Sequence, residues 1–204
     1  MYNNHNPYAN RRHLPVGQLD YQLSSQRALI IRDLKPFCML EFGEQEILFD
    51  IPRILGLGGS YVNLGHALGG SAMLLARGLK DQGLNGLIHS VDTFDNEKNH
   101  RTKADNILQK FDMLNDIKLY QGPTNLFSDA FGSITFLFID ADHSYDGVLS
   151  DFSGYAPKVI QGGALAFHDT NQDYTHRVIE ENLTNNPIWQ QVCHVNRIKV
   201  FKKV

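Results

Sequence analysis

The sequence predicts a single-domain α/β protein built on a doubly wound, mostly parallel sheet of seven strands. Three observations indicate this fold. Short apolar segments alternate with stretches of helical periodicity from residue 60 onward. Several of these segments are apolar throughout, as is typical of strands buried on both faces of a parallel sheet. Strands that alternate with helices form right-handed crossovers, which place helices on both faces of the sheet.

The chain is expected to divide into three parts. Residues 1–15 are rich in Asn, Arg, His and Pro and are expected to form a flexible arm. Residues 16–57 are expected to form an N-terminal extension, and residues 58–204 the α/β domain. The sequence shows no internal repeat and no second core.

The N-terminal extension is expected to contain a helix and a hairpin. Apolar residues at helical spacing predict a helix over residues 19–34, which Pro36 should end because the residue before a proline avoids the helical region. Two apolar runs, residues 37–42 and 47–51, flank a glycine-containing loop at residues 43–46, a pattern that predicts a β-hairpin. The sequence leaves two roles open for the extension, a lid over a substrate and a dimer contact, so formation of a homo-oligomer is undecided.

The α/β domain is expected to follow a regular order of elements. The last two strands are separated only by Asn196, which predicts an antiparallel hairpin at one edge of the sheet. Strands are expected at residues 61–64, 86–92, 117–120, 134–140, 164–169, 190–195 and 197–202, and helices at residues 70–79, 98–114, 148–156 and 174–183.

Composition and charge restrict the function classes. The chain has 204 residues, 42% of them hydrophobic, and a formal net charge of −3. Such a balanced chain is not suited to neutralising many phosphates, which argues against nucleic-acid binding. No apolar run approaches the roughly 20 residues that span a bilayer, and the N-terminus lacks the order of a signal peptide, so we expect a cytoplasmic location and no membrane association. Cys38 and Cys193 are too few for a disulfide framework or a thiolate zinc site.

A glycine-rich turn at residues 65–71 is the first candidate for a binding site. Ligands of open α/β sheets bind outside the carboxyl ends of the strands, and this turn follows a predicted strand. Gly65 permits a tight turn, whereas Gly69 and Gly70 allow a ligand to approach the backbone. Ser71 can cap the next helix, whose free N–H groups attract a carboxylate or a phosphate. The spacing fits neither GxGxxG nor the phosphate-binding loop, and a loop without a ligand is the alternative.

Asp92 ends the next predicted strand. An acid at this place can accept hydrogen bonds from the hydroxyls of a ribose, which suits a nucleotide-like ligand. Such an acid would serve NAD equally well, so a nicotinamide-dependent oxidoreductase is an alternative that the glycine spacing disfavours. The structural alternative for Asp92 is a cap of the segment that follows.

Two further acids, Asp140 and Asp169, end strands that are expected to be neighbours. Adjacent carboxylates repel each other unless a cation or a proton lies between them, and hard oxygen ligands suit Mg²⁺ better than zinc. His143 lies three residues beyond Asp140 and can accept a proton near neutral pH. The alternatives are that Asp142 caps the next helix and that Asp169 only binds backbone.

These blocks together resemble class I S-adenosylmethionine-dependent methyltransferases of Rossmann-like fold. The closest similarity is to the small-molecule O-methyltransferases of methyltransferase family 24, to which metal-dependent enzymes acting on macrolide and aminocoumarin sugars are related. The most specific stretch is Asp140-Ala141-Asp142-His143-Ser144-Tyr145-Asp146-Gly147-Val148. The resemblance covers residues 58–203 and follows the order of blocks at residues 64–71, 91–94, 139–148, 162–163 and 167–169.

The resemblance implies a function and a role for each site residue. The protein is expected to transfer a methyl group from S-adenosylmethionine to a hydroxyl of a small-molecule acceptor such as a sugar, with assistance from Mg²⁺ as an option. His143 is expected to be the catalytic base, and Asp140 and Asp169 the metal ligands. The residues expected to bind the cofactor are Asn63, Gly65, Gly69, Gly70, Ser71, Asp92 and Asp140.

Two departures from the family pattern bear on these roles. Asn63 stands where members usually carry Glu or Asp, and its amide supplies no charge to balance the sulfonium or the ammonium group of the cofactor. Thr170 stands where catechol-type relatives supply a third metal ligand. A binding module that keeps the cofactor site without turnover is therefore the alternative from a different class.

Overall fold

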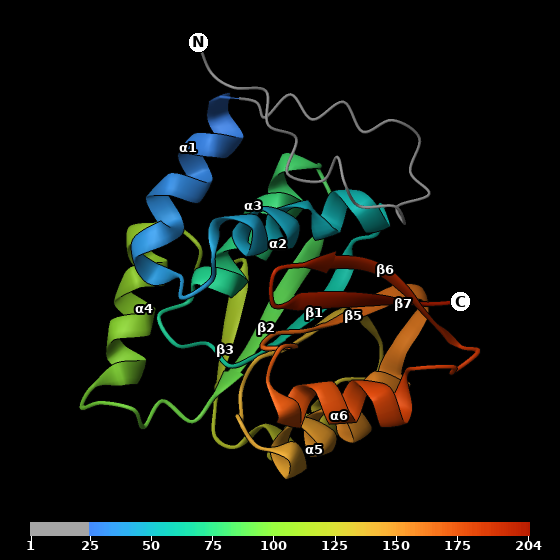
Figure 1. Cartoon of the computed structure of the whole chain (residues 1–204). Helices are drawn as coiled ribbons and strands as arrows, with labels where there is room; N and C mark the ends of the chain where they lie inside the picture. The colour runs from blue at the N-terminus through green and yellow to red at the C-terminus, as the bar shows by residue number, and fades with distance from the viewer. Residues whose placement is uncertain (1–24) are drawn as a thin grey trace.

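The computed structural model describes residues 25–204, and the predicted flexible arm at residues 1–15 lies outside this part. The core of the fold is one seven-stranded sheet of order β3-β2-β1-β4-β5-β7-β6 (Figure 1). The pairs from β3 to β5 are parallel, whereas β7 pairs antiparallel with both β5 and β6. This confirms the predicted fold class and the C-terminal hairpin at a sheet edge. The strands are β1 Gly59–Leu64, β2 Gly86–Asp92, β3 Ile117–Gln121, β4 Ile134–Ile139, β5 Val159–Phe167, β6 Trp189–Val195 and β7 Ile198–Lys203.

Helices cover both faces of the sheet. Helices α5 and α6 pack together on one face, while α2 and α3 pack together on the other, with α1 and α4 beside them (Figure 1). None of the helices in residues 25–204 is both long enough and apolar enough to cross a membrane. The helices are α1 Ser25–Leu34, α2 Phe42–Leu55, α3 Gly70–Asp81, α4 His100–Lys110, α5 Tyr145–Tyr155 and α6 Asp173–Asn182.

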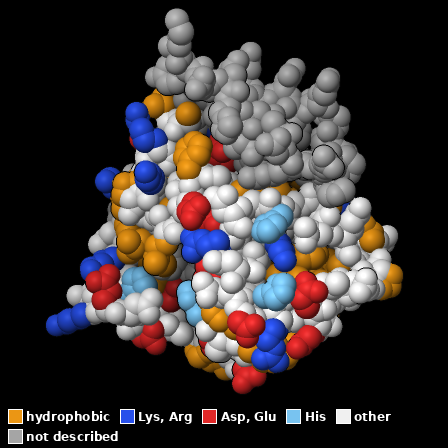
Figure 2. All heavy atoms as spheres, viewed as in Figure 1, with side chains coloured by type: hydrophobic (Ala, Val, Ile, Leu, Met, Phe, Trp, Pro, Cys, Tyr) orange, Lys and Arg blue, Asp and Glu red, His pale blue; other side chains and the backbone are white. Residues whose placement is uncertain are grey.

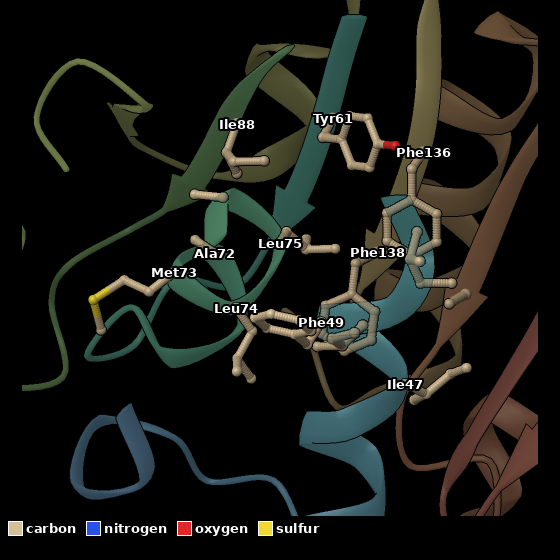
Figure 3. Close-up of a cluster of buried hydrophobic side chains, with 14 of the residues drawn as sticks. Ile47, Phe49, Tyr61, Ala72, Met73, Leu74, Leu75, Ile88, Phe136 and Phe138 are labelled. Atoms are coloured by element: carbon tan, nitrogen blue, oxygen red, sulfur yellow. The ribbon is translucent and has the colours of Figure 1, made fainter. Parts of the chain in front are cut away.

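Strand β4 shows why the central strands are rich in apolar residues. All six of its residues are buried, and successive side chains point to opposite faces of the sheet. Phe136 and Phe138 join the core under α2 and α3, whereas Leu137 and Ile139 join the core under α5 and α6. The first of these cores is drawn in Figure 3, where side chains of α2 and α3 surround Phe138.

The N-terminal hairpin predicted at residues 37–51 is wrong, because residues 42–55 form helix α2. Glu41 and Glu44 form a capping box at the start of this helix. The side chain of each glutamate accepts a hydrogen bond from the backbone N–H of the other. Gly43 therefore lies within the helix and not in a hairpin loop. The first apolar run, residues 37–42, leads into α2, and the second, residues 47–51, lies within it. The prediction failed because a short apolar run does not distinguish a strand from a buried helix.

Acidic and basic side chains are interspersed on the surface. In the view of Figure 2, the described residues show no broad patch of a single sign. This mixture of signs accompanies the small formal net charge of −3.

Candidate active site

The carboxyl ends of five neighbouring strands open into one cavity of about 690 Å³. This is the size range of small-molecule sites. Its wall also includes the segment between α1 and α2, residues 37–40, and Arg197 from the turn between β6 and β7. The predicted residues that line it are Gly65, Gly70, Ser71, Asp92, Asp140, His143 and Asp169. The structure therefore brings most of the predicted site residues into a single cavity.

The glycine turn connects β1 to α3 and forms the floor of the cavity. Gly65 has a φ of +88°, and a Cβ at this position would lie 2.0 Å from the carbonyl oxygen of Asp140. Only glycine can therefore occupy this position without displacing the backbone at the end of the neighbouring strand β4. Helix α3 begins at Gly70, so Ser71 and the free N–H groups of its first turn face the cavity.

Asp92, at the end of β2, holds the glycine turn in place. Its Oδ2 accepts hydrogen bonds from the backbone N–H groups of His66 at 2.7 Å and Ala67 at 2.9 Å, and its Oδ1 accepts one from Phe94 at 2.8 Å. A carboxylate offers about four lone-pair sites, so one remains for a ligand hydroxyl. Asp92 caps the segment that follows, which is one of the two interpretations made from the sequence, and it also lines the cavity. Its contact with ribose hydroxyls stays a prediction.

Asn63 lies behind the glycine turn. Its side chain is fully buried, and its Nδ2 donates hydrogen bonds of 2.8 Å to the carbonyl of Gly65 and to Oγ of Ser90. The same hydroxyl lies 2.8 Å from Nδ1 of His66, and burial lowers the pKa of this imidazole to about 4. Among the described residues, Asn63 and Gly69 are not part of the cavity wall. Asn63 therefore supports the turn, and its assignment to the cofactor stays a prediction.

Asp140 and Asp169 come together because β4 and β5 are neighbours, as predicted. Together with His143 they each offer a ligand atom, and these three atoms lie within 4.8 Å of one another. The side chains of both aspartates are largely buried, whereas that of His143 is 61% exposed. His143 also stacks on Tyr174, with 6.0 Å between ring centroids. Carboxylate oxygens and an imidazole are a donor set that fits a divalent cation.

Neighbouring side chains hold both aspartates, and the hydroxyl of Tyr174 donates to Oδ2 of Asp169 at 3.3 Å. Nδ1 of His168 lies 3.0 Å from Oδ1 of Asp140, and a guanidinium nitrogen of Arg197 donates to Oδ1 of Asp169 at 3.0 Å. Burial raises the pKa of Asp140, and the hydrogen bond from His168 opposes this increase. Burial disfavours the charged form of His168, but its hydrogen bonds to Asp140 and Glu44 outweigh this and raise its pKa to about 9.

The sequence alone did not identify three parts of the site. Arg197 was expected to begin the last strand, but it lies in the turn before β7, where its side chain is 30% exposed and contacts Asp169. Glu44 was expected in a hairpin loop, but it is fully buried below His168. Residues 37–40 line the cavity, and a Cβ on Gly70 would lie 2.5 Å from Cα of Cys38. Each depends on contacts between segments far apart in the chain, which local patterns do not report.

The predicted alternative for Asp142 is also resolved. Helix α5 is capped by Ser144, whose Oγ accepts a hydrogen bond from the N–H of Gly147 at 3.1 Å. Asp142 lines the cavity instead, with its side chain against Gly147.

Comparisons with known proteins agree with this arrangement. A family model for a methyltransferase domain, that of methyltransferase family 24, matches residues 62–170, more than half of the chain. No curated protein matches the chain.

Several solved structures share the fold. The O-methyltransferase NovP has a TM-score of 0.67 and 14% identity, and the match covers 82% of this chain and 82% of NovP. Methyltransferase PaMTH1 of Podospora anserina, bound to S-adenosylhomocysteine (SAH), has a TM-score of 0.66 and 11% identity over 89% of each chain. An O-methyltransferase of Bacillus cereus in complex with SAH has a TM-score of 0.65 and 15% identity, over 90% of this chain and 94% of that chain. The chain belongs to the methyltransferase domain family, and its fold is that of the class I S-adenosylmethionine-dependent methyltransferases.

Proposed function

We propose that this protein transfers a methyl group from S-adenosylmethionine to a hydroxyl group of a small organic acceptor. The observation that carries the proposal is the shared cavity. The glycine turn with Asp92 lies on one side, and Asp140, His143 and Asp169 lie on the other. A methyl donor and a hydroxyl acceptor must lie side by side for in-line transfer, and this cavity has chemically distinct places for the two.

The donor place is formed by the floor of the cavity. The first turn of α3 offers N–H groups that suit the carboxylate of the methionine moiety. Asp92 offers its remaining lone pair to the ribose hydroxyls. The similar structures from Bacillus cereus and Podospora anserina contain SAH, the product of the donor, which supports this assignment.

The acceptor place is formed by the acidic side of the cavity. The sulfonium already activates the methyl group, so the protein must align the acceptor and remove its proton. His143 is exposed to the cavity and takes the role of general base. Asp140 and Asp169 would hold Mg²⁺, and a bound Mg²⁺ supplies Lewis acidity that makes an acceptor hydroxyl easier to deprotonate.

The acceptor is proposed to be a small molecule with neighbouring oxygen atoms, such as a sugar. One structural neighbour, CalS11, is a TDP-rhamnose 3′-O-methyltransferase, with a TM-score of 0.63 and 12% identity. Residues 37–40 also line the cavity, and Met39 among them is 84% exposed. Apolar surface at this place suits the carbon skeleton of an acceptor.

Ligand binding and turnover test the proposal separately. Thermal unfolding is measured with saturating S-adenosylmethionine, SAH, NAD⁺ or buffer alone. A ligand at 100 times its Kd stabilises the folded state by about 2.7 kcal/mol. We expect stabilisation by the two methionine-derived ligands and none by NAD⁺. Methyl transfer to a panel of sugars and catechols is then measured with Mg²⁺ and with EDTA. Stabilisation by NAD⁺ alone would contradict the donor assignment. Donor binding without transfer to any acceptor would favour the binding-module alternative.

A further inference from the structure

Helix α2 places a buried carboxylate directly beneath the acidic side of the cavity. Glu44 lies in the first turn of this helix, and its side chain has no exposed surface. One of its hydrogen bonds is local, because Oε2 accepts from the N–H of Glu41 at 2.8 Å. A cap at a helix start does not require burial, and burying a carboxylate is costly unless its oxygens are well bonded. The reason for the burial of Glu44 therefore lies with its other partners.

Those partners are two side chains of the site. Oε1 of Glu44 accepts from the backbone N–H of Arg197 at 2.9 Å and from its Nε at 3.3 Å, and Oε2 lies 3.3 Å from the terminal nitrogen Nη2. Oε2 also lies 3.4 Å from Nε2 of His168. One carboxylate thus holds both the ring of His168 and the guanidinium of Arg197.

Each held side chain continues to the acidic pair. The ring of His168 bridges two carboxylates, with Nε2 toward Glu44 and Nδ1 at 3.0 Å from Oδ1 of Asp140. Arg197 bridges in the same way, since Nη1 donates to Oδ1 of Asp169 at 3.0 Å. Nδ1 of His168 also lies 3.4 Å from Oδ1 of Asp169. The contacts that start at Glu44 therefore reach Asp140 through His168, and they reach Asp169 through both Arg197 and His168.

We propose that Glu44 is a positioning residue that sets the spacing and orientation of Asp140 and Asp169 through His168 and Arg197. Groups that orient metal ligands from behind change metal affinity by about 10–100-fold when they are removed. Glu44 and Arg197 both lie outside residues 62–170, the region that the family model matches. The inference rests on the proposed function, because it takes the acidic pair to hold a divalent cation.

The test uses the full-length protein and measures binding as well as turnover. Mn²⁺ binding is followed by electron paramagnetic resonance, and SAH binding by calorimetry. Glu44→Gln removes the charge and keeps the size of the side chain. Glu44→Asp keeps the charge but withdraws the carboxylate by one methylene. We expect both variants to bind Mn²⁺ at least tenfold more weakly than the wild type and SAH within twofold of it. The value of kcat should fall while the KM for S-adenosylmethionine is unchanged.

Glu46→Gln is the matched control. Glu46 lies on the same helix, is equally buried and pairs with Arg27 at 3.7 Å, away from His168 and Arg197. This variant should bind Mn²⁺ within twofold of the wild type even if its melting temperature falls. Retained binding of SAH in each variant shows that the cavity has folded.

Arg197→Met tests whether Glu44 acts through its partners. Residues that act through one set of contacts show non-additive effects. The double variant with Glu44→Gln should therefore weaken Mn²⁺ binding by less than the product of the two single effects.

The outcomes separate the inference from the proposed function. Wild-type Mn²⁺ affinity in Glu44→Asp would overturn positioning and leave only a charge effect. Equal losses in Glu44→Gln and Glu46→Gln would overturn it as well. A wild type that turns over without binding Mn²⁺ would overturn the inference and leave the proposed methyl transfer standing. A wild type that binds neither Mn²⁺ nor SAH would overturn the proposed function and the inference with it.

Discussion

The hydroxyl of Thr124 donates a hydrogen bond of 2.5 Å to Oδ1 of Asp151. Thr124 lines the cavity just after β3, whereas Asp151 lies on α5 and is only 1% exposed. The hydroxyl of Tyr155, one turn further along α5, donates to the carbonyl of Thr124 at 2.6 Å. Helix α5 thus holds the segment that forms this wall of the cavity.

Asp151 should make stability depend on pH. Burial raises its pKa from 3.8 to about 6, and the hydrogen bond from Thr124 opposes the increase. Because the folded-state pKa is the higher one, the stabilising contribution is complete below pH 3.8 and is lost as the pH rises through 6. The difference between these two pKa values corresponds to at most about 3 kcal/mol in the free energy of unfolding. Asp151→Asn should remove this loss.

Chemical denaturation between pH 4 and pH 8 measures the effect. The wild type should lose stability relative to Asp151→Asn over this range, and the difference should grow mainly between pH 4 and pH 6. Parallel curves for the two proteins would show that Asp151 titrates near its ordinary pKa in the folded state.

Asp92→Ala should weaken cofactor binding. It removes the acceptor that faces the ribose and also leaves the N–H groups of His66 and Ala67 without their partner. The loss of such bonds amounts to about 1.5–3 kcal/mol, or tenfold or more in the Kd for SAH. Calorimetry measures this Kd. Asp92→Asn, which keeps one acceptor oxygen, should fall between the wild type and Asp92→Ala.

His143→Ala should lower turnover and leave cofactor binding nearly intact. Loss of a general base costs roughly 10²–10⁴-fold in rate. The side chain is 61% exposed, so the melting temperature should change little. Steady-state kinetics and calorimetry on the same preparation separate the two effects. An equal loss of SAH affinity in His143→Ala and Asp92→Ala would contradict the division of the cavity into a donor side and an acceptor side.

Gly65→Ala should destabilise the protein strongly. The added methyl group would collide with the carbonyl of Asp140, 2.0 Å away, at a positive φ. Gly162→Ala is the matched control, because Gly162 also has a positive φ, of +81°, but has no atom within 4 Å of the added carbon. We expect the control to lose about 1–2 kcal/mol of unfolding free energy from backbone strain alone. Gly65→Ala should lose more and should also fail to bind SAH.

Urea denaturation measures both losses. Equal losses in the two variants would mean that the turn moves away from β4 to accept the methyl group, so that the contact with Asp140 is not rigid.

The parallel core could be predicted from the sequence because the apolar pattern that marks each strand lies within the strand itself. Five of the six residues of β4 are apolar because both faces of the strand are buried, and an acid follows directly at its carboxyl end. The general rule that ligands bind at this edge then placed Asp92, Asp140 and Asp169 around one cavity. Asp140 and Asp169 could be paired from the sequence because consecutive strands of such folds are usually neighbours.

The parts that escaped prediction depend on non-local contacts. Residues 42–55 carry an apolar pattern that is short enough to fit a strand, and only the capping box of Glu41 and Glu44 distinguishes the helix. Arg197 resembles any basic residue of an edge hairpin until the turn between β6 and β7 brings it to Asp169. The hydrogen bond that Asn63 donates to Ser90 of the neighbouring strand could not be predicted from the sequence either, and the assignment of Asn63 to the cofactor stays a prediction.

The contacts on the two sides of the cavity differ in sequence separation, that is, in the number of residues between the partners they join. The contacts of Asp92 with His66 and Ala67 join residues 26 and 25 positions apart, whereas Glu44 and Arg197 are 153 positions apart. Long-range contacts carry the larger entropic cost of loop closure and form slowly. During refolding, recovery of SAH affinity should therefore precede recovery of Mn²⁺ affinity, and a stopped-flow experiment with both probes would resolve the interval between them.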